Sequence, residues 1–254
     1  MLDLSIILPT MEGKSKYLEL FFNSLEKNSN CSYEVLVWCN GCDKETIEVV
    51  NNNTDMVFGS DENIGLSIPY NFLVKESNSN LLFFADDDFY FLPKWDNPVS
   101  NYTGDNFFWR NPMLIEKDRP SRSIKDYFGE ISNFRESELL YKYQNYTHKT
   151  IHYGGFMPAF ICKLDYIDIG EYNEDFFIGE ADFLYRTYKY YTDNRVIPTT
   201  DPESLIYHFR LSNRPLNFSN MQLKMFEYME NTYNKSIDEI DDEVPWFEVL
   251  NNAK

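Results

Sequence analysis

The sequence predicts an α/β protein with an open, mostly parallel central sheet and helices on both faces. Short apolar runs alternate with amphipathic segments of helical period through residue 85. The runs are continuous apolar blocks, which is typical of parallel strands buried on both faces. Polar residues follow the runs, at the strand ends where such sheets bind ligands. This alternation predicts right-handed crossovers and one ligand crevice.

Four apolar runs are predicted to be the strands of the first half. The first, LSIILP, ends at Pro9, and the second, YEVLVWC, ends at Cys39. Residues 9–12 follow the first run, Asn40 and Gly41 follow the second, and three aspartates follow the fourth. We expect these groups to converge on one crevice. The predicted strands are residues 4–9, 33–39, 55–59 and 81–85.

Three segments between these runs are predicted to be helices. In the first, Leu18, Phe21, Phe22 and Leu25 recur at helical spacing and form one apolar stripe. In the third, Pro69 lies in the first turn, where proline is tolerated. The predicted helices are residues 17–28, 44–53 and 66–77.

After residue 96 the alternation stops, and the second half is predicted to extend the same sheet as a mixed one. We expect one domain over 1–215. Residues 216–254 are expected to pack on it as a helix and an acidic tail, held through Trp246 and Phe247. The expected strands lie within residues 106–115, 154–164 and 205–209, and the expected helices lie within residues 121–144, 180–191 and 220–234.

Composition indicates a folded protein and argues against polyanionic partners. Aromatic residues make up 17% of the 254 residues, unlike in disordered chains. The formal net charge of -18 repels nucleic acid and anionic lipid, so we expect no nucleic-acid partner. No apolar run reaches the roughly 18 residues of a membrane span, and the start lacks a secretory signal. We therefore expect a cytoplasmic protein without a transmembrane segment.

The CNGC motif is a candidate redox or zinc site through Cys39 and Cys42. A thioredoxin-type pair normally opens a helix, whereas Gly41 lies between these cysteines at a strand end. A zinc site needs two more ligands, which only Cys31, Cys162 and three scattered histidines offer. We therefore favour a structural role for the motif.

The strongest chemical signal is the acidic cluster Asp86, Asp87 and Asp88, which follows the apolar run 81–85. Adjacent carboxylates repel one another unless a cation lies among them. Carboxylate oxygens suit Mn²⁺ or Mg²⁺, which complete their coordination with water and phosphate oxygens. Side chains alternate along an extended segment, so Asp86 and Asp88 are expected to face one side and Asp87 the other. The alternative is a solvated acidic turn.

The order of these motifs resembles the family 2 glycosyltransferases, which have a Rossmann-like GT-A fold. The resemblance covers most of residues 3–213 and rests on LSIILPT, EVLVWCNGCDKET, ENIGLSIPYN, LLFFADDDFYFLPKW and EADFLYR. It implies a metal-dependent, inverting hexosyltransferase. Residues 1–100 then form the half that binds the nucleotide sugar, and residues 101–215 form the half that binds the acceptor.

The resemblance also implies roles for individual residues on the donor side. Cys39 departs from the family pattern, because many members have an aspartate there that contacts uracil. The base is therefore open between UDP-, GDP- and dTDP-sugars, with a UDP-sugar favoured. The implied metal ligands are Asp88, Asp86 and His208, and Arg210, Ser212 and Arg214 are further phosphate partners. The implied nucleotide-binding residues are Pro9, Thr10, Glu12, Asn40, Asn63 and Asp86.

On the acceptor side, Glu180 occupies the position that the resemblance assigns to the catalytic base. A carboxylate there removes the proton of an acceptor hydroxyl as the new bond forms. Asp182 is the second choice, and the structural alternative for both is negative charge at a helix N-terminus. Asp175, Trp95 and Trp109 are candidates to line the sugar or acceptor pocket, with core packing as the alternative.

These residues predict a single displacement in which a cation neutralises the leaving diphosphate and Glu180 activates the acceptor. The acceptor is a glycan, a lipid-linked sugar or a protein. One rival is a nucleotidyltransferase, for which the segment PTMEGKSK offers only one glycine and two lysines. A second rival is a degenerate module that binds sugar nucleotides or glycans without catalysis.

Overall fold

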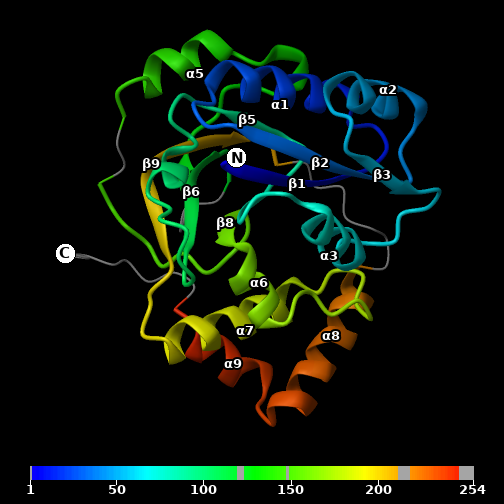
Figure 1. Cartoon of the computed structure of the whole chain (residues 1–254), viewed down its shortest axis with the longest axis vertical. Helices are drawn as coiled ribbons and strands as arrows, with labels where there is room; N and C mark the ends of the chain where they lie inside the picture. Colours follow the sequence, from blue (N-terminus) through cyan, green and yellow to red (C-terminus); the bar gives the residue numbers. More distant parts are fainter. Residues whose placement is uncertain (1, 119–122, 147–148, 211–217, 246–254) are drawn as a thin grey trace.

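The structure is a computed structural model that describes residues 2–118, 123–146, 149–210 and 218–245. In this part of the chain nine strands form one sheet, and helices cover both of its faces (Figure 1). The strand order is β3-β2-β1-β4-β8-β6-β9-β5, with β7 paired to β6. The predicted α/β class, with an open sheet that becomes mixed in the second half, is confirmed.

The elements alternate between strand and helix as far as β4, and the order is irregular after it. The strands are β1 Leu4–Thr10, β2 Tyr33–Asn40, β3 Val57–Ser60, β4 Leu81–Phe84, β5 Phe89–Phe91, β6 Trp109–Glu116, β7 Ser123–Lys125, β8 Ala159–Cys162 and β9 Thr199–His208. The helices are α1 Ser15–Asn28, α2 Lys44–Asn53, α3 Ser67–Glu76, α4 Asn97–Ser100, α5 Glu136–Tyr143, α6 Lys163–Ile169, α7 Glu180–Asp193, α8 Phe218–Tyr233 and α9 Ile237–Glu243, and a 3₁₀ turn spans Ile131–Asn133.

The first half forms the parallel part of the sheet. β1 pairs with β2 and β4, and β2 pairs with β3, all in parallel. Every residue of β1 is buried, because a central strand with helices on both faces has no solvent-facing side. The three helices predicted between these strands are present, and Pro69 lies in the first turn of α3.

Two apolar layers hold the helices against this sheet. On one face, Leu18 and Phe21 of α1 belong to the same buried cluster as Ile6 of β1. On the opposite face, Ile7 of β1 belongs to a second buried cluster with Tyr166 of α6 and with side chains of α3 and α7. Neighbouring residues of a strand point to opposite faces, so one short apolar run supplies both layers.

The second half makes the sheet mixed and places the end of β9 beside the aspartates. β8 pairs antiparallel with β4 and with β6, and β6 pairs in parallel with β9. β9 then runs antiparallel to β5, in a register that puts His208 opposite Phe89. Since Phe89 follows the three aspartates directly, this register positions His208 next to them.

Some second-half elements differ from the sequence-based expectation. The sequence does not predict β5, because a three-residue run forms a strand only when β9 supplies its partners. Segment 154–164 contains only the four-residue strand β8, after which α6 begins. Segment 121–144 contains the expected helical stretches as α5 and the 3₁₀ turn, and it also contains the strand β7, which the sequence does not predict.

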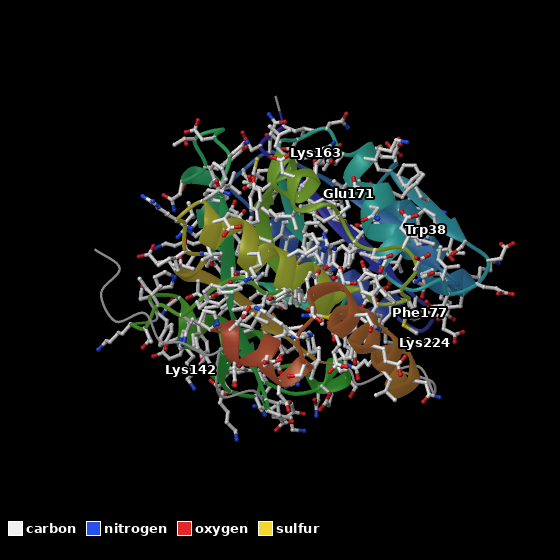
Figure 2. All side chains as sticks on the ribbon, turned by 90° about the horizontal axis from the view of Figure 1, so that it is seen from below. Trp38, Lys142, Lys163, Glu171, Phe177 and Lys224 are labelled. Atoms are coloured by element: carbon white, nitrogen blue, oxygen red, sulfur yellow. The ribbon has the colours of Figure 1, made fainter. Side chains whose placement is uncertain are left out.

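The C-terminal helices pack beyond α7. Met225 and Met229 of α8 and Ile240 of α9 form a buried cluster with Tyr185 of α7. The view from below shows α8 and α9 on this side of the molecule, with Lys224 on α8 (Figure 2). Within the described ranges, no helix has the length and apolar character needed to cross a bilayer.

The acidic tail contains a helix, α9, that its composition does not predict. The Ser236 side chain accepts a hydrogen bond from the Glu239 N–H, and the Glu239 carboxylate accepts one from the Ser236 N–H. This capping box satisfies two N–H groups at the start of the helix. Trp246 and Phe247, the expected anchors of the tail, lie outside the described residues.

Candidate active site

The three aspartates lie at the carboxyl end of β4, and their side chains point in two directions. One ligand atom from each of Asp86, Asp88 and His208 lies within 4.8 Å of the others. Asp87 turns away, so that its Oδ1 lies 2.7 Å from Lys14 Nζ and its Oδ2 accepts a 2.8 Å hydrogen bond from Thr10. The alternation of an extended segment accounts for this division.

His208 is held between carboxylates on both of its ring nitrogens. Its Nε2 lies 3.2 Å from Asp88 Oδ1 and 3.9 Å from Asp86 Oδ2, and its Nδ1 lies 2.7 Å from Glu116 Oε1. Glu116 ends β6 and is buried. Because β6 and β9 are parallel, their carboxyl ends meet at one edge of the sheet. A carboxylate on the far nitrogen fixes the orientation and tautomer of a ring, as it does behind many metal-binding histidines.

A cavity of about 180 Å³ lies in front of this cluster. Its polar wall contains Asp86, Glu116, Glu180 and His208, which come from the ends of β4, β6 and β9 and from the start of α7. The apolar and aromatic wall includes Leu66, Tyr70, Met157, Pro158, Tyr172 and Ile178. The cavity therefore opens at the carboxyl edge of the sheet, where ligands bind in open α/β folds.

The crowding of carboxylates changes the pKa values of two members of the cluster. Burial raises the pKa of Asp86 to about 7, the neighbouring Asp88 and Asp87 add to the rise, and His208 opposes it. Because 49% of the Asp86 side chain is exposed, water screens part of this effect. Burial disfavours the imidazolium of His208, but Asp88 and Glu116 outweigh it and raise the pKa of His208 to about 10. Without a metal ion, the imidazolium supplies positive charge to the cluster at neutral pH, and a bound cation would replace the proton on Nε2.

The chemistry of the donor set fits a divalent cation. Asp86 and Asp88 offer carboxylate oxygens, which Mg²⁺ and Mn²⁺ prefer, and the imidazole of His208 suits Mn²⁺. Glu116 stands behind His208 as a hydrogen-bond partner. Two carboxylates and one imidazole leave further coordination positions for water or phosphate oxygens.

Asn40 and Asn63, two predicted nucleotide-binding residues, hold a loop together. The Asn40 side-chain amide donates to Gly65 O at 2.8 Å and to Asn63 Oδ1 at 2.9 Å, and its oxygen accepts from the Ile64 N–H at 2.8 Å. Asn40 is buried, and Asn63 is exposed. The amide of Asn40 therefore fixes the loop that precedes α3.

The other predicted nucleotide residues follow β1. Pro9 and Thr10 are buried, and Thr10 binds Asp87. Glu12 is exposed in the turn that leads to α1. The structure therefore places Thr10 against the acidic cluster and leaves the Glu12 side chain open to solvent.

The two predicted bases have different surroundings. Glu180 lines the cavity at the start of α7. Asp182 is 1% exposed, and its two oxygens accept hydrogen bonds from Arg186 at 2.9 Å and from Tyr233 at 2.6 Å. The Tyr233 bond ties α7 to α8, and Asp182 does not line the cavity, so its position favours the structural alternative.

The three other predicted pocket residues, Trp95, Trp109 and Asp175, are not among those that line the cavity. Trp95 and Trp109 are fully buried in the apolar clusters, so the core-packing alternative holds and the pocket role is wrong for both. Asp175 is exposed in the loop before α7. Arg210 follows β9, and Ser212 and Arg214 lie outside the described residues.

The CNGC motif shows no metal-site geometry. All four cysteines are free thiols. Cys39 is buried at the end of β2, and Cys42 Sγ lies 3.5 Å from Thr10 O. Among the residues with described positions, the groups able to hold a metal ion do not include these thiols.

Sequence reasoning misses three residues of the site. Glu116 directly follows the predicted run 106–115, and the rule that strand ends carry the site points to it. Lys14 stands in the segment PTMEGKSK but carries no signal of burial beside Asp87. Tyr172, which lies between α6 and α7, has no local signal at all.

Removal of the Lys14 charge is expected to destabilise the protein. The Lys14→Met variant leaves Asp87 buried without its cation, which costs about 3 kcal/mol of unfolding free energy in comparable pairs. Urea unfolding at pH 7 measures the loss. Lys16→Met, at an exposed position two residues away, is the control and is expected to stay within about 0.5 kcal/mol of wild type. Equal stability of the two variants would contradict the role of the pair.

Removal of the Asp86 charge is expected to have the opposite effect. A carboxyl with a raised pKa binds its proton more tightly in the folded state, so its contribution to stability falls as pH rises from about 4 to about 7. In metal-free buffer, Asp86→Asn should therefore melt at a higher temperature than wild type, with a larger difference at pH 8 than at pH 5.5. Asp61→Asn, on an exposed loop, is the control. A lower melting temperature for Asp86→Asn at pH 8 would refute the assignment.

Comparison with known proteins identifies solved structures with a similar fold. Neither a protein-family model nor a curated protein sequence matches the chain. The crystal structure of S. aureus TarS 1-349 matches with a TM-score of 0.57 and 16% identity, over 92% of this chain and 72% of that one. The same fragment in complex with UDP matches with a TM-score of 0.55 and 16% identity, over 95% of this chain and 75% of that one. A further TarS crystal structure matches with a TM-score of 0.54 and 16% identity, over 93% of this chain and 44% of that one. The chain therefore shares the fold of TarS, in agreement with the GT-A-like architecture that its motifs predict.

Proposed function

We propose that the protein is a metal-dependent, inverting glycosyltransferase that transfers a hexosyl group from a nucleotide-diphosphate sugar to an acceptor hydroxyl. The observation that carries the proposal is one cavity that brings Asp86 and His208 together with Glu180 at the carboxyl edge of the sheet. The fold supports it, because a fragment of TarS with this fold has been crystallised with UDP.

Each charged residue has a defined task in this proposal. Asp88, Asp86 and His208 hold Mn²⁺ or Mg²⁺, which when bound neutralises the charge of the departing diphosphate. Glu116 orients the His208 ring through its 2.7 Å contact with Nδ1. Glu180 accepts the proton of the acceptor hydroxyl as that oxygen attacks the anomeric carbon. A single attack of this kind inverts the anomeric configuration.

The donor and acceptor are expected to enter from different sides of the cavity. The nucleotide of a UDP-sugar lies along the ends of β1 and β2, within residues 1–100, and the acceptor is bound by residues 101–215. Glu180 belongs to the second segment, and Asp86 belongs to the first.

The geometry favours this proposal over the two rivals. A nucleotidyltransferase needs a free basic group to bind a triphosphate, and Lys14 is already paired with Asp87. A degenerate binding module has no need for a carboxylate at the position of Glu180, in the same cavity as Asp86 and His208. Both arguments against the rival functions refer to the residues that the structure describes.

Binding of Mn²⁺ and UDP together is expected to raise the melting temperature by more than either alone, because Asp86 and Asp88 would hold the ion and its charge would favour binding of the diphosphate. The Asp88→Asn variant should lose this gain. Asp55→Asn, at an exposed position between α2 and β3, should keep it. A thermal-shift titration with UDP, GDP and dTDP measures the effect and identifies the base. If no nucleotide stabilises the wild-type protein with Mn²⁺, the proposed function is wrong.

Replacement of the base is expected to remove catalysis without removing donor binding. Glu180→Gln should lower kcat for sugar transfer by about 10²- to 10⁴-fold, the usual contribution of a general base. Its affinity for Mn²⁺ and UDP should stay at the wild-type value. Asp193→Asn, at the other end of α7, is the matched control. Full transfer activity in Glu180→Gln would rule out this residue as the base.

A further inference from the structure

The Tyr172 hydroxyl is a buried polar group that the proposed chemistry leaves unused. Tyr172 is 3% exposed and forms part of the cavity wall, together with Tyr70, Asp86 and Glu180. Among the described residues its hydroxyl has no hydrogen-bond partner. A buried hydroxyl without a partner is unfavourable, and in native proteins such groups call for a specific explanation.

The Tyr172 side chain is fixed in place from several directions. Its ring stacks on Phe183 of α7, with centroids 4.5 Å apart and planes at 16°. The Asn71 side chain of α3 accepts a hydrogen bond from the Tyr172 N–H at 3.0 Å and donates one to Tyr172 O at 2.9 Å. These contacts hold the backbone and the ring, so the hydroxyl cannot turn away to find another partner.

Two other buried tyrosines serve as comparisons for Tyr172. Tyr166 packs beside Tyr172, and its hydroxyl donates to Asn71 Oδ1 at 2.6 Å, as a core tyrosine normally does. Tyr153 is also 3% exposed with an unpartnered hydroxyl, but it does not line the cavity. Tyr172 combines the unpartnered hydroxyl with a place in the wall of the candidate site.

The size and lining of the cavity indicate a single sugar ring. A volume of about 180 Å³ is smaller than the roughly 300–1,000 Å³ of sites that enclose drug-sized ligands, so a whole nucleotide sugar does not fit. The lining combines apolar side chains, such as Leu66, Met157 and Ile178, with carboxylates. A pyranose ring has the matching surfaces, because its C–H face is apolar and its edge carries hydroxyl groups.

We propose that the Tyr172 hydroxyl forms a hydrogen bond with a ring hydroxyl of the transferred sugar and thereby selects the donor hexose. This assignment rests on the proposed glycosyltransferase function. Asp86 and His208 in the same cavity place the diphosphate beside it, so the donor sugar is the part of the substrate within reach. The acceptor approaches along exposed Glu180, whereas Tyr172 lies in the buried part of the wall.

The test compares wild type with Tyr172→Phe and Tyr153→Phe, which each remove one buried, unpartnered hydroxyl. Calorimetry with Mn²⁺ first measures the affinity for UDP, GDP and dTDP, and then for the glucose, galactose and N-acetylhexosamine donors of the nucleotide that binds. Tyr172→Phe should bind the free nucleotide as wild type does. It should lose about tenfold in affinity for the preferred sugar donor and discriminate less between epimers. Tyr153→Phe should match wild type throughout.

The outcomes separate the inference from the function on which it rests. If wild type binds no nucleotide with Mn²⁺, the proposed function fails and this inference fails with it. If wild type binds a nucleotide sugar and Tyr172→Phe binds it equally well, the function stands and the inference is overturned. An unchanged donor affinity with a raised KM for the acceptor also overturns it, since the hydroxyl then serves the acceptor. The melting temperature of Tyr172→Phe should not fall, because its hydroxyl has no protein partner in the described residues.

Discussion

The mutual repulsion of three consecutive carboxylates at the end of a buried strand is the constraint on which the rest of the site depends. In the folded protein the repulsion is reduced because the three carboxylates have different surroundings. Asp87 is neutralised inside the protein by Lys14, and Asp88 is paired with the imidazolium of His208. Asp86 remains partly open to the cavity, with a pKa raised to about 7. The cluster is thus stable enough to fold and still attractive to a cation.

The strand order in the second half of the sheet brings Glu116 and His208 next to this cluster. The antiparallel strand β8 separates β4 from β6, and β9 returns alongside β5. As a result, the carboxyl ends of β6 and β9 carry Glu116 and His208 to the same edge as the aspartates. The line from Glu116 through His208 to Asp88 orients the imidazole from both sides. This arrangement requires the antiparallel pairing of β9 with β5, which a purely parallel sheet does not have.

The two sides of the cavity are tied together through the start of α3. The Leu66 N–H donates to Phe177 O at 2.7 Å, and the Gly179 N–H donates to Ser67 Oγ at 3.1 Å (Phe177 is labelled in Figure 2). Gly65 has a φ of 89°, and a Cβ atom there would collide with the Phe177 carbonyl. The loop that Asn40 fixes therefore packs directly on the segment that carries Glu180. These two hydrogen bonds join the start of α3 to the segment that precedes Glu180.

The sequence by itself determined the first-half strands and helices, the apolar stripe of α1 and the division of Asp86 and Asp88 from Asp87. These features depend on periodicity and side-chain alternation within a few residues, which a linear pattern records. Only the tertiary structure decided which groups complete the site. Glu116 and His208 are 92 positions apart, and Lys14 and Asp87 are 73 apart, so their pairing depends on strand order and register. Long-range packing also buries Trp109 and Asp182 and places Tyr172 at the cavity. The burial of a residue depends on the elements that pack over it and not on its neighbours in the sequence.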